Sequence, residues 1–205
     1  MAKVLFLAAD PYPTHASVSR QLATEFLKVY ISRNVRDEIK VLNLCEETIP
    51  AVDYAVLNAW DNIAAGTPVS DFPRIWQDKL KSYDALSEEF FSADKYVAVF
   101  PSWNLTVPPQ LVSYLLSALP PSGKNKIPNG ENKKVLLICS SAYICSDTAA
   151  PNYCAGVDWL KRLFKLCGVE DFDAVFAEGM EQFPENREEI IKNAKVAVQV
   201  YAKTF

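Results

Sequence analysis

Hydrophobic residues in this chain fall into short continuous runs that alternate with sets at helical spacing. The run KVLFLAA, Lys3 to Ala9, is continuously apolar, which is typical of a strand covered on both faces. The segment Ser17 to Arg33 follows, with Leu22, Phe26, Val29 and Tyr30 at helical spacing. The pattern therefore predicts a strand followed by a helix.

The same alternation continues along the chain. We expect further strands at 38–44, 94–100, 134–140 and 172–176, with 38–44 nearer the edge of a sheet. We expect further helices at 72–91, 107–119, 151–166 and 185–201. The helix 72–91 is predicted to turn one side to the core, through Ile75, Leu80, Tyr83, Leu86 and Phe90.

Glycines and prolines mark the boundaries of these elements. The prolines Pro108 and Pro109 fit the first turn of the helix 107–119, and Gly168 fits a C-terminal cap. Residues 46–70 are predicted to be irregular. A second loop is expected before residue 134, from Pro120, Pro121, Gly123, Pro128 and Gly130.

Strands that alternate with helices predict an α/β protein, in which a parallel sheet has helices on both faces. Five strands favour the flavodoxin-like, doubly wound order 2-1-3-4-5. Because no internal repeat or linker divides the chain, residues 1–205 are expected to form a single domain. In such sheets ligands bind beyond the carboxyl ends of the strands, near the switch point between strands 1 and 3.

Composition and charge narrow the classes of binding partner that we expect. The net charge of -4 and the dispersed basic residues do not favour nucleic-acid binding, and the stretch Lys124 to Lys134 is typical of a solvated loop. No apolar run approaches the roughly 20 residues of a membrane span. Asp10 and Pro11 end the first apolar run where a signal peptide would continue. We therefore expect a cytoplasmic protein without a membrane partner.

The cysteines and the histidine do not predict a metal site. The chain has five cysteines without CxxC spacing and one histidine, His15, so no structural zinc site is expected. Most of the thiols are predicted to be small buried side chains. Cys145, in the polar stretch SSAYICSD, is the one candidate for a reactive thiol.

Three loops leave the predicted strands at the edge where ligands bind. They are DPYPTHASVS after strand 1, PSWNLTVP after strand 3 and SSAYICSD after strand 4. All three are rich in hydroxyl, amide or aromatic side chains. This coincidence predicts a binding site formed by the three loops.

The first loop has the features of an anion site. Thr14, His15, Ser17 and Ser19 lie at the entrance to the first helix, where free N–H groups and the helix dipole favour an anion. The alternative is an ordinary N-cap provided by Ser17 or Ser19. Because GxGxxG and GxxxxGKS are both missing, neither a dinucleotide-binding motif nor a P-loop is predicted.

The loop after strand 3 has the features of a site for a flat heterocycle. Trp103 offers an aromatic surface, and Asn104 offers both a donor and an acceptor. Pro101 and Pro108 restrict the backbone between them, which favours fixed N–H groups. The alternative is a Trp103 packed between helices with Asn104 in a turn.

These motifs resemble those of the FMN-dependent NADH-azoreductases, flavodoxin-fold quinone and azo reductases, over essentially the whole chain. The resemblance rests on the strand KVLFL, the stretch Ser17 to Leu22, the loop Pro101 to Pro108 and the motif Val175 to Gly179. The family's flavin loop typically reads P-M-[YW]-N-F-x-[IV]-P. The matching positions here are Pro101, Trp103, Asn104, Val107 and Pro108.

The resemblance implies a set of FMN-binding residues and a homodimer. It places the phosphate near Asp10, Ser17, Val18 and Ser19, and the flavin ring along Ser102, Trp103, Asn104 and Leu105. It places the flavin edge at Ser140, Ser141, Ala142 and Tyr143. It implies NADH or NADPH as the donor, and it names no catalytic acid, nucleophile or metal ligand.

The chain departs from the family pattern in two loops. Ala9 and Asp10 stand where the family usually has a serine, and a carboxylate there repels a phosphate unless it points away. Ala142 and Tyr143 stand where the family tends to have two glycines. Tyr143 is expected either to stack on the flavin or to fill its space.

Three hypotheses of function follow. The first is an FMN-dependent oxidoreductase that takes hydride from NADH and reduces quinones or azo compounds by ping-pong kinetics, with Trp103, Tyr143 and Phe172 shaping the substrate slot. The second is a flavin-free relative that acts as a binding or interaction module. The third is a hydrolase with a serine or cysteine in the loop after strand 4 and His15 as base.

Overall fold

A five-stranded parallel sheet forms the centre of the computed structural model, which describes residues 1–119, 130–149 and 153–205. Its order is β2-β1-β3-β4-β5. The strands are β1 (Lys3–Ala8), β2 (Glu38–Asn43), β3 (Lys95–Pro101), β4 (Lys134–Ser140) and β5 (Asp171–Ala177). The predicted α/β class, the parallel sheet and the order 2-1-3-4-5 are confirmed, as is the edge position of β2.

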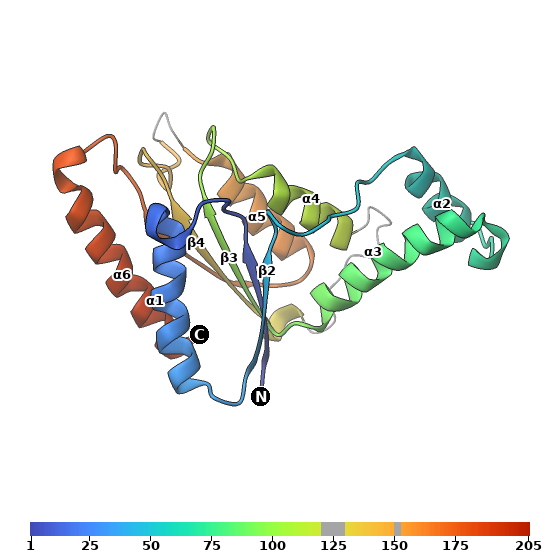
Figure 1. The fold of residues 1–205 in the computed structure, drawn as a ribbon, viewed down its shortest axis with the longest axis horizontal. Helices are drawn as coiled ribbons and strands as arrows, with labels where there is room; N and C mark the ends of the chain where they lie inside the picture. Colours follow the sequence, from blue (N-terminus) through green and yellow to red (C-terminus); the bar gives the residue numbers. More distant parts are fainter. Residues whose placement is uncertain (120–129, 150–152) are drawn as a thin grey trace.

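Helices cover both faces of the sheet (Figure 1). The helices α1 (Val18–Arg33) and α6 (Arg187–Thr204) pack on one face, and α4 (Pro109–Ala118), α5 (Ala155–Leu166) and the end of α3 (Arg74–Ser92) pack on the other. Successive strand residues point to opposite faces, so Val4 and Phe6 contact the first layer while Leu5 and Leu7 contact the second. The continuous apolar run of β1 is explained by this double burial.

The ends of the predicted helices are largely confirmed. Pro109 lies in the first turn of α4, and Gly168 follows α5 with a φ of 92°, which lets Val169 N–H bond to Phe164 O at 2.9 Å. The helix predicted from Pro151 begins at Ala155 in the structure. Pro151 and the predicted loop residues Pro120, Pro121, Gly123 and Pro128 lie outside the described residues.

The prediction of an irregular segment at 46–70 is wrong. This segment contains the helix α2 (Tyr54–Ala64) and a short 3₁₀ turn, Val69–Asp71. Asp53 caps α2 by accepting a hydrogen bond from Val56 N at 3.0 Å, and Trp60 packs edge-on against Tyr83 of α3 at 5.2 Å. The helix is therefore stabilised by contacts with the next helix, α3.

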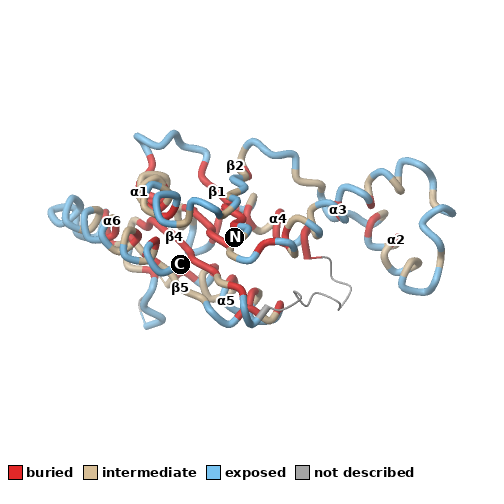
Figure 2. Tube along the Cα trace, turned by 90° about the horizontal axis from the view of Figure 1, so that it is seen from below, coloured by how far each residue is buried: buried red, intermediate tan, exposed pale blue. Residues whose placement is uncertain are grey.

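The segment 54–80, called the arm below, projects beyond the sheet (Figures 1 and 2). It consists of α2 and the first turns of α3, whose last turns reach the sheet. Ile75 was predicted to face the core, but it is 74% exposed because this end of α3 has no sheet beneath it. Leu80, Tyr83 and Phe90 are buried as predicted.

Two further findings concern the hydrophobicity of the helices and the burial of the cysteine side chains. Among the helices of residues 1–119, 130–149 and 153–205, none has the length and hydrophobicity that crossing a membrane requires. The thiols of Cys139, Cys145, Cys154 and Cys167 are buried as predicted, whereas Cys45 is half-buried.

Candidate functional site

The three polar loops emerge side by side at the carboxyl edge of the sheet, because β1, β3 and β4 are neighbours (Figure 1). Hydrogen bonds continue the sheet into the loops. Ala9 N donates to Val99 O at 2.8 Å, and Ser102 N donates to Ser140 O at 2.7 Å. The structure thus brings the predicted residues of the second and third loops into direct contact.

The second loop is a tight hairpin turn with a strained backbone. Trp103 N bonds to Thr106 O and Thr106 N to Trp103 O, both at 3.0 Å. Between them Asn104 and Leu105 adopt φ values of 48° and 62°, the left-handed region that is costly for side chains other than Gly or Asn. Strained residues of this kind persist where surrounding contacts enforce them, and they cluster at ligand sites.

This turn presents its polar groups outward. Asn104 is exposed, Leu105 is 43% exposed and Trp103 is half-buried. Within the described part of the chain, the N–H groups of Asn104 and Leu105 have no carbonyl partner. Asn104 thus lies in a turn, as the alternative interpretation of this loop expected, and the turn also carries an exposed amide and N–H donors beside Trp103. These groups fit the edge of a flat heterocycle, and their binding to one stays a prediction.

Gly156 holds the hairpin turn in place, and the sequence analysis missed it. It lies in the first turn of α5, where a Cβ atom would be 2.6 Å from Val107 N and 2.8 Å from Thr106 Oγ1. Only a glycine lets the helix approach the loop backbone so closely. The available signal was a glycine inside the predicted helix 151–166, where glycine is unfavourable unless a close contact requires it.

The loop after β4 is anchored by a carboxylate from the next strand. Glu178 accepts hydrogen bonds from Cys145 N at 2.8 Å, Ser146 N at 2.9 Å and Ser146 Oγ at 2.6 Å. Ser140 and Ser141 are buried, and Ser141 N donates to Ala177 O at 2.8 Å. Glu178 is a second residue that the sequence analysis quoted in a motif without assigning it a role.

The two residues of this loop that depart from the family pattern lie nearer the surface. Ala142 is half-buried and its carbonyl accepts from Glu181 N at 2.8 Å, while Tyr143 is 45% exposed. The ring of Tyr143 is thus free to contact a ligand from the solvent side. Whether it stacks on a flavin or takes its space stays a prediction.

The first loop is organised around Asp10, which is 1% exposed. Its carboxylate accepts hydrogen bonds from Ser17 Oγ, from Ser19 Oγ at 2.6 Å and from Tyr12 N at 3.0 Å. Ser17 is also the N-cap of α1 and accepts from Arg20 N at 3.1 Å. Ser17 is therefore both the cap of α1 and, with Ser19, a hydrogen-bond donor to an anion, and the carboxylate of Asp10 points toward the two hydroxyls rather than away.

Arg20 fixes this loop and was not singled out from the sequence. Its Nε donates to Asp10 O at 2.9 Å, and one terminal nitrogen donates to the same carbonyl and to Asn43 Oδ1 at 3.0 Å. The guanidinium thereby links the ends of β1 and β2. Val18, on the same turn as the serines, packs into the core with α1.

The candidate site has two parts, one that could face the ring of a flavin mononucleotide and one that could face its phosphate. The hairpin turn at 103–106 has the donors and the aromatic surface that suit the ring. In the other half, the hydroxyls of Ser17 and Ser19 are already bonded to a carboxylate. The residues therefore fit the flavin ring, and their fit to the phosphate depends on Asp10.

The thiol and histidine do not form a nucleophilic site. Cys145 is buried, and its hydrogen bond to Cys139 and its burial raise the pKa of its thiol to about 12. Reactive cysteines have a lowered pKa and solvent access. His15 lies exposed in the 3₁₀ turn Thr14–Ala16.

Phe172 lies near the amino ends of β4 and β5, at the far edge of the sheet, where it pairs with Val135 and packs against Phe164 at 6.4 Å. It also lines a cavity of 310 Å³ that extends to Cys145 and Ser146 of the loop after β4. Its place in a substrate slot stays a prediction.

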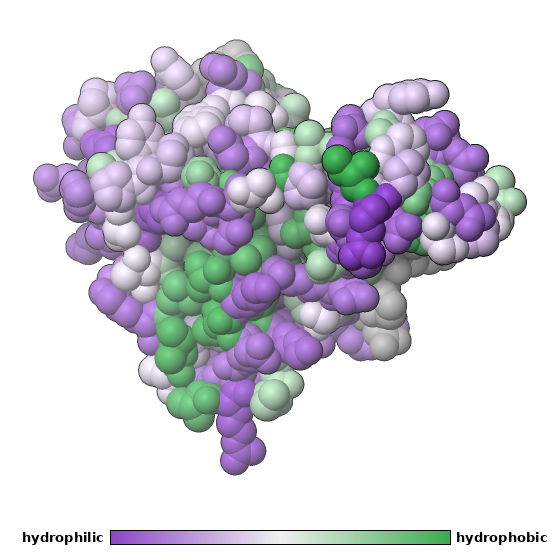
Figure 3. Space-filling view, turned by 45° about the vertical axis from the view of Figure 1, so that its right-hand side comes forward, coloured by the Kyte–Doolittle hydropathy of each residue, from purple (hydrophilic) through white to green (hydrophobic). Residues whose placement is uncertain are grey.

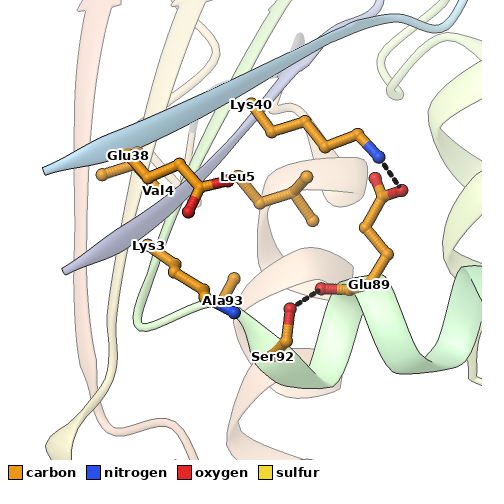
Figure 4. Close-up of a pocket in the computed structure, with 8 residues that line it drawn as sticks. All are labelled: Lys3, Val4, Leu5, Glu38, Lys40, Glu89, Ser92 and Ala93. Carbon is orange, nitrogen blue, oxygen red and sulfur yellow. Dashed lines mark hydrogen bonds and ion pairs between the residues drawn. The ribbon is translucent and has the colours of Figure 1, made fainter.

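A cavity of 230 Å³ also lies at the far edge (Figure 4). It is lined by the first residues of β1 and β2 and the last turn of α3, and an ion pair between Lys40 and Glu89 spans one side. Ligands of parallel α/β sheets bind at the carboxyl ends of the strands, so this cavity does not belong to the site described above.

Comparisons with known proteins place the chain among flavin enzymes. The family model described as flavodoxin-like fold matches residues 2–202. An FMN-dependent NADH:quinone oxidoreductase 2 from Listeria monocytogenes serotype 4b (strain F2365) is 34% identical over 212 residues, covering 100% of both chains. An FMN-dependent NADH:quinone oxidoreductase from Staphylococcus aureus (strain bovine RF122 / ET3-1) is 32% identical, also over 100% of both chains.

A solved structure has the same fold over its whole length. The crystal structure of an azoreductase from Bacillus anthracis str. Sterne is 28% identical and superposes with a TM-score of 0.88, covering 100% of each chain. The resemblance inferred from the strand, serine and hairpin motifs is confirmed by these similarities.

Proposed function

We propose that this chain, which belongs to the family of proteins with a flavodoxin-like fold, is an FMN-dependent NADH:quinone oxidoreductase that also reduces azo compounds. The observation that carries the proposal is the strained hairpin turn at Asn104 and Leu105, held open at the carboxyl edge of β3. The similar proteins, which are NADH:quinone oxidoreductases, indicate NADH as the donor and quinones as the acceptor class.

The chain's residues bind and orient rather than react. Trp103 would support one face of a flat ring. Asn104 would bond to the ring's heteroatoms, together with the N–H groups of Asn104 and Leu105, which have no carbonyl partner among the described residues. A bound flavin would supply the redox chemistry, since it can take a hydride and pass electrons on. Tyr143 is 45% exposed and would contact a donor or an acceptor from the solvent side, and a donor and an acceptor that use this side in turn would give ping-pong kinetics.

One observation favours a second candidate function. The carboxylate of Asp10 already bonds to the hydroxyls of Ser17 and Ser19, which supports a flavin-free relative that keeps the fold as a binding module. The hydrolase hypothesis has no such support, because the thiol of Cys145 is buried with a raised pKa.

The arm supports a homodimer. Tyr54 is 80% exposed and Ile75 is 74% exposed, and both lie on a segment that projects from the sheet. Figure 3 shows a band of hydrophobic surface on the body below the arm and further hydrophobic residues on the arm itself. Two copies can cover these surfaces mutually. A cytoplasmic location without nucleic-acid or membrane partners stays a prediction from the sequence.

The visible absorbance spectrum tests the proposal. The purified protein is incubated with excess FMN and desalted, and then assayed for quinone reduction with NADH. Retained flavin bands and NADH-dependent turnover are expected. A colourless protein without turnover contradicts the oxidoreductase and favours the flavin-free module.

Asn104→Gly tests the hairpin turn itself. Glycine keeps the left-handed backbone but removes the amide, so FMN affinity is expected to fall about tenfold, as the loss of about one hydrogen bond predicts, without loss of thermal stability. The control is Asn193→Ala, which removes an exposed amide from α6. Equal FMN affinity in Asn104→Gly and the control removes Asn104 from the site.

A further inference from the structure

The hydroxyl groups of Ser17 and Ser19 already donate hydrogen bonds within the protein. A serine hydroxyl has one proton to donate, and the hydroxyls of Ser17 and Ser19 both direct theirs to Asp10 Oδ2. The two oxygens lie 3.1 Å apart, so they converge on one acceptor position. That position is held by a side chain of the same loop.

The carboxylate cannot easily leave this position. Asp10 is 1% exposed, and turning outward would leave Tyr12 N–H and both hydroxyls without their acceptor. Its own carbonyl is bonded to Arg20, which is tied in turn to Asn43 at the end of β2. The backbone is therefore held while the side chain is bound.

The carboxylate of Asp10 accepts hydrogen bonds but is not paired with a cation. Among the described residues no ion pair includes Asp10, and the guanidinium of Arg20 bonds to its carbonyl and not to its carboxylate. A phosphate dianion placed against the serines would lie within a few ångströms of a buried negative charge. The hydroxyls would have to be shared between the two anions.

We propose that the carboxylate of Asp10 occupies the anion position of the first loop. The site consequently binds a flavin through its ring and gains little affinity from its phosphate. This inference rests on the proposed flavin-dependent function and specifies its cofactor class. FMN and riboflavin, which lacks the phosphate, bind with similar affinity. Asp10 is thus the residue that sets flavin selectivity.

Asp10→Asn tests this inference by removing the charge with little change in shape. Protein freed of flavin is titrated with FMN and with riboflavin, and the quenching of flavin fluorescence gives the two dissociation constants. The variant is expected to bind FMN at least about tenfold more tightly than the wild type, about 1.4 kcal/mol. Its affinity for riboflavin is expected to stay nearly unchanged.

Matched variants keep the result interpretable. Asp171→Asn removes an exposed carboxylate at the amino end of β5, far from the first loop, and is expected to leave both affinities unchanged. Asp10→Ser is the second variant if Asp10→Asn does not fold, and thermal melting without flavin reports folding for each.

The outcomes separate this inference from the proposed function. If the wild type strongly prefers FMN and Asp10→Asn does not tighten FMN binding, the role of Asp10 is overturned while the flavin enzyme stands. An equal gain for FMN and riboflavin also overturns it, because the effect would then not act on the phosphate. If no folded variant binds either flavin, both proposals fail.

Discussion

At the scale of single residues, the same left-handed backbone conformation has a different energetic cost for two neighbouring residues. Asn104 and Leu105 both have a positive φ, but asparagine tolerates this region and leucine does so only at a cost of about 1–2 kcal/mol. The strain is maintained by the paired bonds between Trp103 and Thr106 and by the approach of Gly156. The sequence predicted a turn with a special role, but not which residues are strained.

Leu105 offers a test of that strain. Leu105→Gly is expected to leave the free energy of unfolding unchanged or raise it slightly, because glycine adopts φ of 62° freely. Leu105→Val is expected to lower it by about 1 kcal/mol, since a β-branched side chain is less tolerated at positive φ. Urea unfolding of both variants measures the difference, and equal stability of the two would show that the turn relaxes in solution.

At the scale of elements, helices and loops hold one another in position around the site. The hairpin turn after β3 rests against the first turn of α5, and the loop after β4 is tied to the end of β5 by Glu178. Elements that were predicted separately thus depend on contacts between them. The helix α2 shows the same dependence, because it packs on α3 and its Trp60 contacts Tyr83 edge-on.

Gly156→Ala tests the contact between α5 and the hairpin turn. The added methyl group meets backbone atoms of Thr106 and Val107, so the variant is expected to lose about 1–3 kcal/mol of stability and to bind flavin more weakly. Gly66→Ala is the control. It has no neighbour within 4 Å but a φ of 102°, so it is expected to lose stability without a change in flavin binding. Unchanged flavin binding in Gly156→Ala would contradict the supporting role of α5.

At the scale of the whole molecule, a buried polar cluster joins the amino ends of the strands. Asp37 accepts hydrogen bonds from Tyr30 Oη at 2.6 Å and Ala2 N at 2.7 Å, and Lys95 Nζ lies 3.5 Å away. Burial opposes the ionisation of Asp37, but these hydrogen bonds and the lysine charge outweigh it and hold its pKa below the usual value. The cluster links α1, β1, β2 and β3 at the edge opposite the site.

This cluster predicts how stability depends on pH. Because the folded-state pKa of Asp37 is lowered, its contribution is complete above the usual pKa of about 4 and is lost as the pH falls through the lowered value. Asp37→Asn is expected to lower the free energy of unfolding at pH 7 by about 2 kcal/mol. The deficit should shrink as the pH falls from the usual pKa through the lowered folded-state pKa, where the wild type also loses the charge. Urea unfolding at several pH values measures it, and a deficit that is constant with pH would assign the effect to packing.

A substitution in the arm tests whether two chains associate through it. Light scattering after gel filtration is expected to give twice the 22.9 kDa mass of the chain for the wild type. Ile75→Glu places a charge on the exposed arm and is expected to shift the protein toward the monomer. Val196→Glu makes the same change at an exposed position of α6 and should have no effect. A monomeric wild type, or a dimer broken only by Val196→Glu, would move the interface away from the arm.

The sequence by itself predicted the α/β class and the alternation of strands and helices, because hydrophobic periodicity is a local property, and five such strands favoured the observed order. It also singled out the three loops of the candidate site by their polar and aromatic side chains. The exposure of Ile75 and the helix α2 were decided only by tertiary structure, since they depend on which segments lie against each other. The same holds for Asp10. Its presence beside two serines is visible in the sequence, but its direction follows from hydrogen bonds to Ser17, Ser19 and Tyr12 and from the burial of the folded loop.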